Sequence, residues 1–344
     1  MLVDVHQHLW TAELVEALAA RDDRPFIRED HGLTVLHLAG EQPYVIDCHA
    51  EAPERRAALV ALDGLDRALV CLSSPLGIEA LPRRASQPLL AAYLDGALAL
   101  PGDFGVWAPF ALDAPDPDDV AAAVARGCVG ASCPAGALAS VHGLGILRPV
   151  LQRLEELDAP LFVHPGPAPG SPARESRLDD PLWWPALTDY VADMQAAWCA
   201  FVSVGRREHP RLRVVFSMLA GLAPLQAERL QVRGGSAVTP DPLSFYDCSS
   251  YGARAIGAVA DVVGPSQIVY GSDRPVVDPG PLPAGHDDGR SSYAAASAEL
   301  LAPAAPGVVG RRAPATGTEW PSPSEPVWAD RPMTAPPDRA TISP

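Results

Sequence analysis

Three histidines and one aspartate are the residues best suited to hold a metal ion. His6 and His8 stand two positions apart in a short apolar segment typical of a β-strand, so both imidazoles point to the same side of that strand. His164 ends a second apolar run, and Asp273 follows a third one that ends in Tyr270 and Gly271. If the carboxyl ends of these strands converge, the four side chains form an N3O site with an open position for water, as in catalytic zinc sites. The sequence therefore predicts one divalent metal ion.

The segments that must position these residues alternate between short apolar runs and longer runs of helical period, a pattern typical of parallel strands joined by helices. Eight segments are strand candidates, the number that a closed barrel needs. They are Leu2–His6, Ala68–Leu72, Phe104–Phe110, Cys128–Ser132, Pro160–His164, Leu212–Phe216, Leu243–Cys248 and Gln267–Gly271. Helices are expected at Pro53–Leu62, Asp118–Arg126, Leu147–Asp158, Pro224–Arg233 and Arg254–Val263. The predicted fold is an α/β (β/α)8 TIM barrel over residues 1–280.

Three stretches depart from this repeat. Leu33–Ile46 is interpreted as a small hairpin inserted after the first strand, and Pro165–Pro185 as a proline-rich loop that ends in two tryptophans. Both are expected at the mouth formed by the carboxyl ends of the strands. Residues 281–344 hold 12 of the 38 prolines, so we expect a disordered tail with one helix at 291–301.

Composition limits the partners. The chain has 344 residues and a formal net charge of -16, which disfavours nucleic acid and anionic membranes and makes a small-molecule substrate the expected partner. It contains no lysine, which excludes Schiff-base chemistry and a metal bridge built on a carboxylated lysine. Neither an amino-terminal signal pattern nor a long apolar run is present, so a cytoplasmic location is expected, and a homodimer is left open. The six scattered cysteines are interpreted as reduced, mostly buried thiols.

Three motifs together resemble the amidohydrolase superfamily. They are DVHQH at Asp4 to His8, FVHPG at Phe162 to Gly166, and YGSDRP at Tyr270 to Pro275, and they appear in the family's order. The resemblance is to the amidohydrolase-related branch, which includes aminocarboxymuconate semialdehyde decarboxylase, and it covers Met1 to about Pro279. It implies a mononuclear divalent metal, usually Zn2+, held by residues matching His6, His8, His164 and Asp273.

One departure from the family concerns proton transfer. Where the family commonly has a histidine after the sixth strand, this chain has Met218, and a thioether cannot carry a proton. Asp273 is therefore the expected catalytic base as well as a ligand. His142 and Asp247 are further candidates near the mouth. The alternatives are a surface histidine for His142 and a structural carboxylate for Asp247.

Further side chains are candidates for substrate binding. Arg274, directly after Asp273, could hold a substrate carboxylate in a bidentate ion pair, or it could pair with an acidic loop nearby. Trp183, with Trp184, could cover an aromatic or cyclic substrate, or anchor its loop to the barrel. His142 could also contact the substrate.

Three functions are consistent with these residues. The first is hydrolysis, in which metal-activated water attacks the carbonyl of an ester, lactone or amide in a small carboxylated substrate. The second is metal-dependent, non-oxidative decarboxylation at the same site. The third is a catalytically impaired barrel that still binds metal, which the Met218 departure favours.

Overall fold

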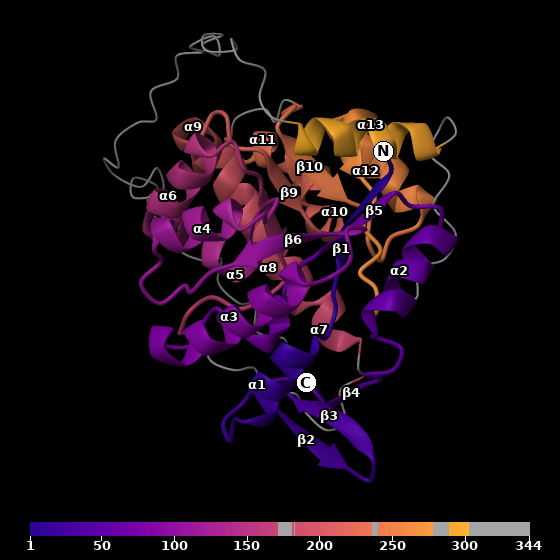
Figure 1. Ribbon diagram of the computed structural model, residues 1–344. Coiled ribbons are helices and arrows are strands. Elements are labelled where there is room, and N and C mark those ends of the chain that lie inside the picture. The colour runs from indigo at the N-terminus through magenta and orange to yellow at the C-terminus, as the bar shows by residue number, and fades with distance from the viewer. Residues whose placement is uncertain (171–180, 182, 236–239, 278–288, 303–344) are drawn as a thin grey trace, which may run out of the picture. The chain divides into compact units, whose positions relative to one another are not determined.

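Eight parallel strands form the centre of the computed structural model (Figure 1). The structure describes residues 1–170, 181, 183–235, 240–277 and 289–302. The strands neighbour one another in chain order. In that order they are β1 (Val3–Gln7), β5 (Arg67–Val70), β6 (Phe104–Pro109), β7 (Gly130–Pro134), β8 (Leu161–His164), β9 (Val214–Phe216), β10 (Ser244–Asp247) and β11 (Ile268–Val269). Each lies within two or three residues of a strand expected from the sequence.

The segment after β11 closes this sheet on β1. The amide of Val5 donates to the carbonyl of Tyr270 at 2.9 Å, and the amide of Asp273 donates to the carbonyl of His6 at 2.8 Å. The amide of His8 then donates to the carbonyl of Arg274 at 2.7 Å. With helices between the strands, the structure is a (β/α)8 barrel, so the predicted fold is confirmed.

Helices and short helical turns cover the outside of the barrel (Figure 1). The longer helices are α1 (Ala12–Ala19), α2 (Pro53–Leu62), α3 (Arg83–Leu98), α4 (Pro117–Ala125), α6 (Val141–Glu156), α8 (Asp189–Ala200), α12 (Ala253–Val263) and α13 (Gly289–Leu301). The shorter ones are α5 (Ala135–Leu138), α7 (Trp184–Leu187), α9 (Arg206–Glu208), α10 (Met218–Gly221), α11 (Ala227–Val232), the 3-10 turns Ser74–Leu76, Ala223–Gln226 and Pro265–Gln267, and the π-helical turn Phe201–Gly205. Among the described residues, no helix is both long and apolar enough to cross a membrane.

Large apolar side chains fill the barrel interior. Val5 of β1, Trp107 of β6 and Phe162 of β8 are fully buried and belong to one inner cluster. The indole of Trp107 donates to the carbonyl of Val5 at 2.9 Å, which satisfies the polar atom of the largest of these side chains. Because the interior is packed, polar chemistry is confined to the strand ends.

The insertion after β1 is larger than the predicted hairpin. It is a three-stranded antiparallel sheet of β2 (Phe26–Asp30), β3 (Leu33–His37) and β4 (Tyr44–Ile46). The hairpin Leu33–Ile46 corresponds to β3 and β4, and the prediction was wrong in omitting β2. That strand is short and highly charged, and its one fully buried side chain is Ile27, which lies opposite Leu36. The sheet lies on the side of the barrel where the strands end (Figure 1).

The last described helix covers the seam between the first and last strands. α13 packs against β1 and β11, with Tyr293, Ala296 and Leu300 buried. It occupies the stretch where the sequence allowed a closing helix, so the described barrel extends beyond residue 280. The remaining tail, residues 303–344, lies outside the described residues.

Candidate metal centre

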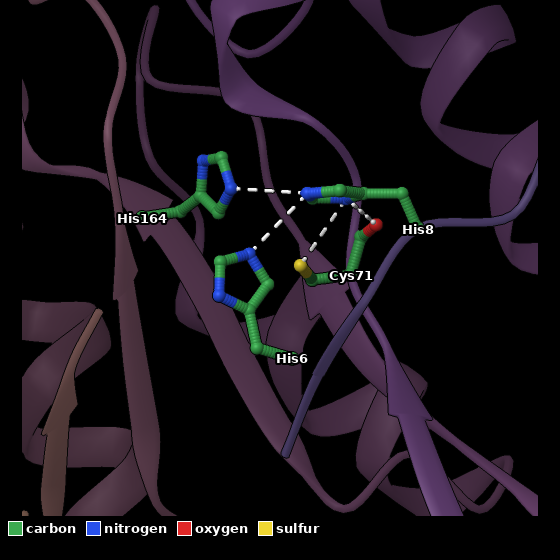
Figure 2. A group of neighbouring side chains, drawn as sticks. All are labelled: His6, His8, Cys71 and His164. Atoms are coloured by element: carbon green, nitrogen blue, oxygen red, sulfur yellow. Dashed lines mark hydrogen bonds between the residues drawn. The ribbon is translucent and has the colours of Figure 1, made fainter. Parts of the chain in front are cut away.

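Three imidazoles converge at the carboxyl ends of β1 and β8 (Figure 2). The Nε2 atom of His8 lies 3.3 Å from Nε2 of His6 and 3.2 Å from Nε2 of His164. All three side chains are buried, with at most 4% of each residue exposed. His6 and His8 share a face because they stand two positions apart. The pairing of β1 with β5 is irregular between Asp4 and Gln7, and there His6 points to the interior directly after Val5, which also lies in the inner cluster.

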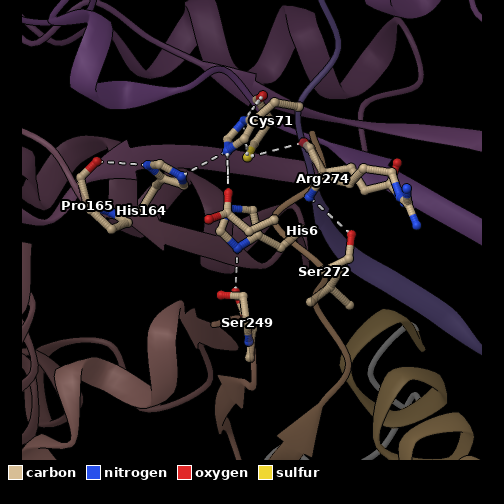
Figure 3. A network of polar contacts seen from close by, with 12 residues as sticks. His6, Cys71, His164, Pro165, Ser249, Ser272 and Arg274 are labelled. Carbon is tan, nitrogen blue, oxygen red and sulfur yellow. Dashed lines mark hydrogen bonds and ion pairs between the residues drawn. The ribbon is translucent and has the colours of Figure 1, made fainter. Parts of the chain in front are cut away.

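Each imidazole is held through its other ring nitrogen (Figure 3). Nδ1 of His6 lies 2.7 Å from Oδ2 of Asp247, and Nδ1 of His164 lies 2.8 Å from the carbonyl oxygen of Pro165. Nδ1 of His8 lies 3.0 Å from the carbonyl oxygen of Cys71. Carbonyl and carboxylate oxygens only accept, so each Nδ1 donates and leaves an Nε2 lone pair that faces the others.

This arrangement fits a divalent cation. Three nitrogen lone pairs facing one another repel unless a cation or a proton lies between them, and metal-bound histidines usually donate their other nitrogen to an oxygen. His6, His8 and His164 would therefore hold the ion through Nε2. The predicted trio is brought together as the sequence indicated.

Asp273 supplies an oxygen to the same group. Its Oδ1 lies 3.1 Å from Nε2 of His8 and 3.4 Å from Nε2 of His6. Its side chain is 18% exposed, more than those of the two imidazoles. The backbone of Asp273 is left-handed, with φ at 58°. Its amide donates to the carbonyl of His6 in β1, and its carboxylate turns toward the histidines. Asp273 thus lies on the more open side of the histidine group.

The charges around the site favour a positive centre. Burial lowers the pKa of His6, but the carboxylates of Asp247 and Asp273 outweigh burial and raise it to about 10. Burial, together with His6 and His8, lowers the pKa of His164 well below its usual value. Burial raises the pKa of Asp273, but the charge of His6 and the hydrogen bond to His8 outweigh it, so the net shift is downward. The cluster therefore accommodates one shared positive charge rather than three.

A buried polar network behind β1 holds the HxH motif in register with the last strand. Oδ1 of Asp4 accepts from the amides of His6 and Ser272, both at 3.0 Å. Oδ2 of Asp4 accepts from the side chain of Gln7 at 2.8 Å, and Gln7 accepts in turn from Arg56 at 2.8 Å. Asp4, Gln7 and Arg56 are each at most 2% exposed. The network therefore fixes the relative positions of His6 and the Ser272–Asp273 turn.

Cys71 is the residue at this site that sequence analysis missed. Its thiol belongs, with the three imidazoles, to a group whose ligand atoms all lie within 4.8 Å of one another. The sequence placed Cys71 among ordinary buried thiols, because a cysteine in an apolar run is usually part of the core. Like the other five cysteines it is a free thiol, and Cys48 and Cys199 are the two exposed ones.

Of the candidate substrate-binding residues, one is paired with another side chain and the others are exposed. The guanidinium of Arg274 lies 3.0 Å from Oδ2 of Asp63, so it forms the ion pair that was the alternative for this residue. Trp183 and Trp184 are 55% and 47% exposed, with ring centroids 5.8 Å apart. His142 is exposed on the first turn of α6. Their roles in binding a substrate stay predictions.

Met218 begins an unusual backbone segment directly after β9. All five residues from Met218 to Leu222 have positive φ angles, between 51° and 63°. Four of them carry side chains, for which a left-handed conformation costs about 1–2 kcal/mol per residue. The side-chain amide of Gln195 donates to the carbonyl of Gly221 at 2.7 Å, which ties the segment to α8. Backbone strain of this kind concentrates at functional sites.

Comparison with solved structures shows that this fold is shared. The isoorotate decarboxylase (IDCase) of Metarhizium anisopliae is similar with a TM-score of 0.65 at 16% identity, over 87% of this chain and 91% of that one. The 5-carboxyvanillate decarboxylase of Sphingomonas paucimobilis is similar with a TM-score of 0.60 at 17% identity, over 87% and 98%. A structure described as amidohydrolase II gives a TM-score of 0.62 at 17% identity, over 88% and 99%. The chain thus has the fold of amidohydrolase-type decarboxylases.

The sequence comparisons give no further relative. No protein-family model matches the chain, and no curated protein matches it. At 14–17% identity, the solved structures define the fold alone.

Proposed function

We propose that the protein is a metal-dependent, non-oxidative decarboxylase of a small carboxylic acid. The observation that carries the proposal is the convergence of three buried Nε2 atoms and Oδ1 of Asp273 at the carboxyl ends of the barrel strands. Active sites of barrels with this architecture lie at that end. Several solved structures that share the fold are decarboxylases of small carboxylic acids, which favours this reaction over hydrolysis.

The ion is proposed to be divalent, with Zn2+ and Mn2+ as the candidates. Three imidazoles suit zinc, the ion expected from the sequence. The 5-carboxyvanillate decarboxylase of Novosphingobium aromaticivorans was solved with bound manganese and a substituted nitrobenzoic acid. When bound, the ion would supply the positive charge that holds the carboxylate of the substrate and a neighbouring oxygen.

In this proposal Asp273 moves the proton. Decarboxylation breaks the bond between the carboxylate carbon and its neighbour, and the electron pair stays on the neighbour until a proton arrives there. The carboxyl group of Asp273 borders the imidazoles from the more exposed side, where a substrate would approach. Asp273 would relay that proton from solvent to the carbon, so the net reaction takes up one proton, releases carbon dioxide and consumes no water.

Hydrolysis is the second candidate. The amidohydrolase II structure with the same fold supports it, as does a ligand set that leaves a position for water. In this reaction Asp273 would accept the proton of the attacking water. Water would then be incorporated into the product, which distinguishes the two reactions.

The experiment compares two substrate panels on protein loaded with Zn2+ or Mn2+. Hydroxylated benzoates, including 5-carboxyvanillate and 2,6-dihydroxybenzoate, are assayed for carbon dioxide, and esters, lactones and amides are assayed for acid release. We expect carbon dioxide from an aromatic acid, lost in a His164→Ala variant. Acid release from an ester, lactone or amide, without carbon dioxide from any benzoate, would indicate a hydrolase instead of a decarboxylase. One bound metal per chain without either product would indicate the impaired barrel.

A further inference from the structure

The path of β5 directs the thiol of Cys71 into the metal centre. Cys71 follows the last residue of β5, and its amide donates to the carbonyl of Gln7 at 2.9 Å, which continues the pairing with β1. Alternate residues share a face, so Cys71 points to the interior as Leu69 does, and both belong to the inner cluster. The thiol is therefore placed at the end of the barrel, in the layer of the histidines.

The surroundings of Cys71 are those of a metal ligand rather than of an ordinary core thiol. Cys71 is 1% exposed, and its Sγ lies within 4.8 Å of a ring nitrogen of each of the three histidines. Figure 2 shows the sulfur on the side of the group where His6 and His8 face each other. The thiol donates to the carbonyl of Gln7 at 3.6 Å, and a thiol is only a weak donor.

The ligand geometry distinguishes Cys71 from Asp273. The group of ligand atoms that lie within 4.8 Å of one another consists of the three imidazoles and Cys71. Three imidazoles and one thiolate give zinc four protein ligands, and zinc accepts a fifth when a substrate oxygen binds. Asp273, on the more exposed side, is then free for proton transfer, which removes the conflict between its roles as ligand and base.

We propose that Cys71 binds the metal as a thiolate, so that the centre is a His3Cys site with Asp273 beside it. This inference rests on the proposed metal centre. On binding, the S–H bond of Cys71 gives way to a sulfur–metal bond, and the proton leaves to solvent. Because thiolate is a soft ligand, the site prefers Zn2+, Co2+ or Cd2+ to Mn2+.

The test uses the full chain loaded with Co2+, in a background where the exposed Cys48 and Cys199 are replaced by serine to prevent stray binding. We expect a sulfur-to-cobalt charge-transfer band in the near ultraviolet. Cys71→Ser should abolish the band, while Cys133→Ser should leave it intact. Cys133 is the matched control, because it is a fully buried thiol of a barrel strand outside the metal-ligating group. Cys71→Ser should also reduce the preference for Zn2+ over Mn2+ by at least tenfold.

A measurement on the unaltered protein covers the case in which Cys71→Ser does not fold. X-ray absorption at the zinc edge should show one sulfur at about 2.3 Å from the ion. Stoichiometric metal with nitrogen and oxygen neighbours only, or a band that persists in Cys71→Ser, would overturn the thiolate ligand and leave the proposed function standing. Failure to bind any divalent ion would overturn both.

Discussion

Asp247 accepts a 2.7 Å hydrogen bond from Nδ1 of His6, and this bond joins the seventh barrel strand to the first at the metal centre. The other oxygen of Asp247 accepts from the amide of Ser249 at 2.5 Å, so the carboxylate is fixed before any ion binds. The approach is close enough that position 271 requires glycine, since a Cβ there would lie 2.6 Å from Asp247 and 2.9 Å from His6. Asp247 therefore positions His6, a candidate metal ligand.

Replacing Asp247 by asparagine should weaken metal binding without removing a ligand. The amide cannot accept as a charged oxygen does, so His6 loses orientation and basicity, and such outer partners are typically worth about 10–100-fold in metal affinity. Competition with a chelating dye measures the change. Asp95→Asn, on the exposed surface of α3, is the control. An unchanged metal affinity in Asp247→Asn would contradict the role of Asp247 in positioning His6.

Loss of the HxH pair should abolish the centre. Replacing His6 and His8 together by alanine leaves one imidazole, which is too few nitrogen ligands for stable binding. Elemental analysis of the purified variant should find no stoichiometric metal, whereas His37→Ala, in the inserted sheet, should retain it. Full occupancy in the double variant would show that the ion binds elsewhere.

Glu79 should make stability depend on pH. Burial raises the pKa of this carboxyl to about 7, and the hydrogen bond from Ser74 at 2.6 Å offsets only part of that effect. The folded protein thus binds the proton more tightly than the unfolded chain, so the free energy of unfolding decreases as the pH rises from about 4.5 to about 7. The total loss is about 3 kcal/mol and levels off above pH 7.

Glu79→Gln removes this titration. Urea unfolding between pH 5 and 8 should show a weaker decline for the variant than for the parent, with the largest difference at pH 8. Glu54→Gln, exposed on α2, serves as the reference and should follow the parent curve. Parallel curves for Glu79→Gln and the parent would contradict the buried, protonated state.

Met218→His should introduce a proton carrier directly after β9. The backbone of Met218 has a φ of 53°, a region in which histidine is enriched, so the replacement does not add backbone strain. A positioned acid or base contributes about 10²- to 10⁴-fold, so turnover on an active substrate should rise, with a second limb in the pH profile. Met218→Leu changes the thioether without adding a proton carrier. Equal turnover in both variants would place proton transfer elsewhere.

The left-handed segment after β9 should respond to glycine in a position-dependent way. Ala220 has a φ of 55°, so Ala220→Gly relieves strain and should raise the free energy of unfolding by about 1 kcal/mol. Gly221→Ala should lower it, because a Cβ there would lie 2.9 Å from the carbonyl oxygen of Val191. Chemical denaturation of the metal-free protein measures both. Destabilisation by Ala220→Gly would mean that lost contacts of the methyl group exceed the strain.

The sequence was sufficient for the barrel and for the histidine group, because both depend on local periodicity. The runs that contain His6, His8 and His164 are apolar, and residues at strand ends meet whenever parallel strands close. By contrast, β2 was missed because only Ile27 of that strand is fully buried, which leaves no alternating pattern. Cys71 was missed because the direction of a thiol depends on the pairing of β5 with β1, which connects distant parts of the chain.

Arg274 shows a further limit. It stands next to Asp273 in the sequence, yet its guanidinium reaches Asp63, just beyond the end of α2. Adjacent residues in a turn point in different directions, and the types of these residues do not determine the geometry of the turn. The same holds for Met218, where no residue pattern predicts five consecutive left-handed residues.

The hydrogen bonds that close the barrel, from Asp273 to His6 and from His8 to Arg274, lie beside the candidate metal ligands. During translation His6 and His8 leave the ribosome first, and Asp273 follows only after more than 260 further residues. A nascent chain therefore carries the two imidazoles without the seam that orients them. The hydrogen bonds that orient His6 and His8 form only when the last strand reaches the first, so the candidate centre takes its final geometry after the barrel has closed.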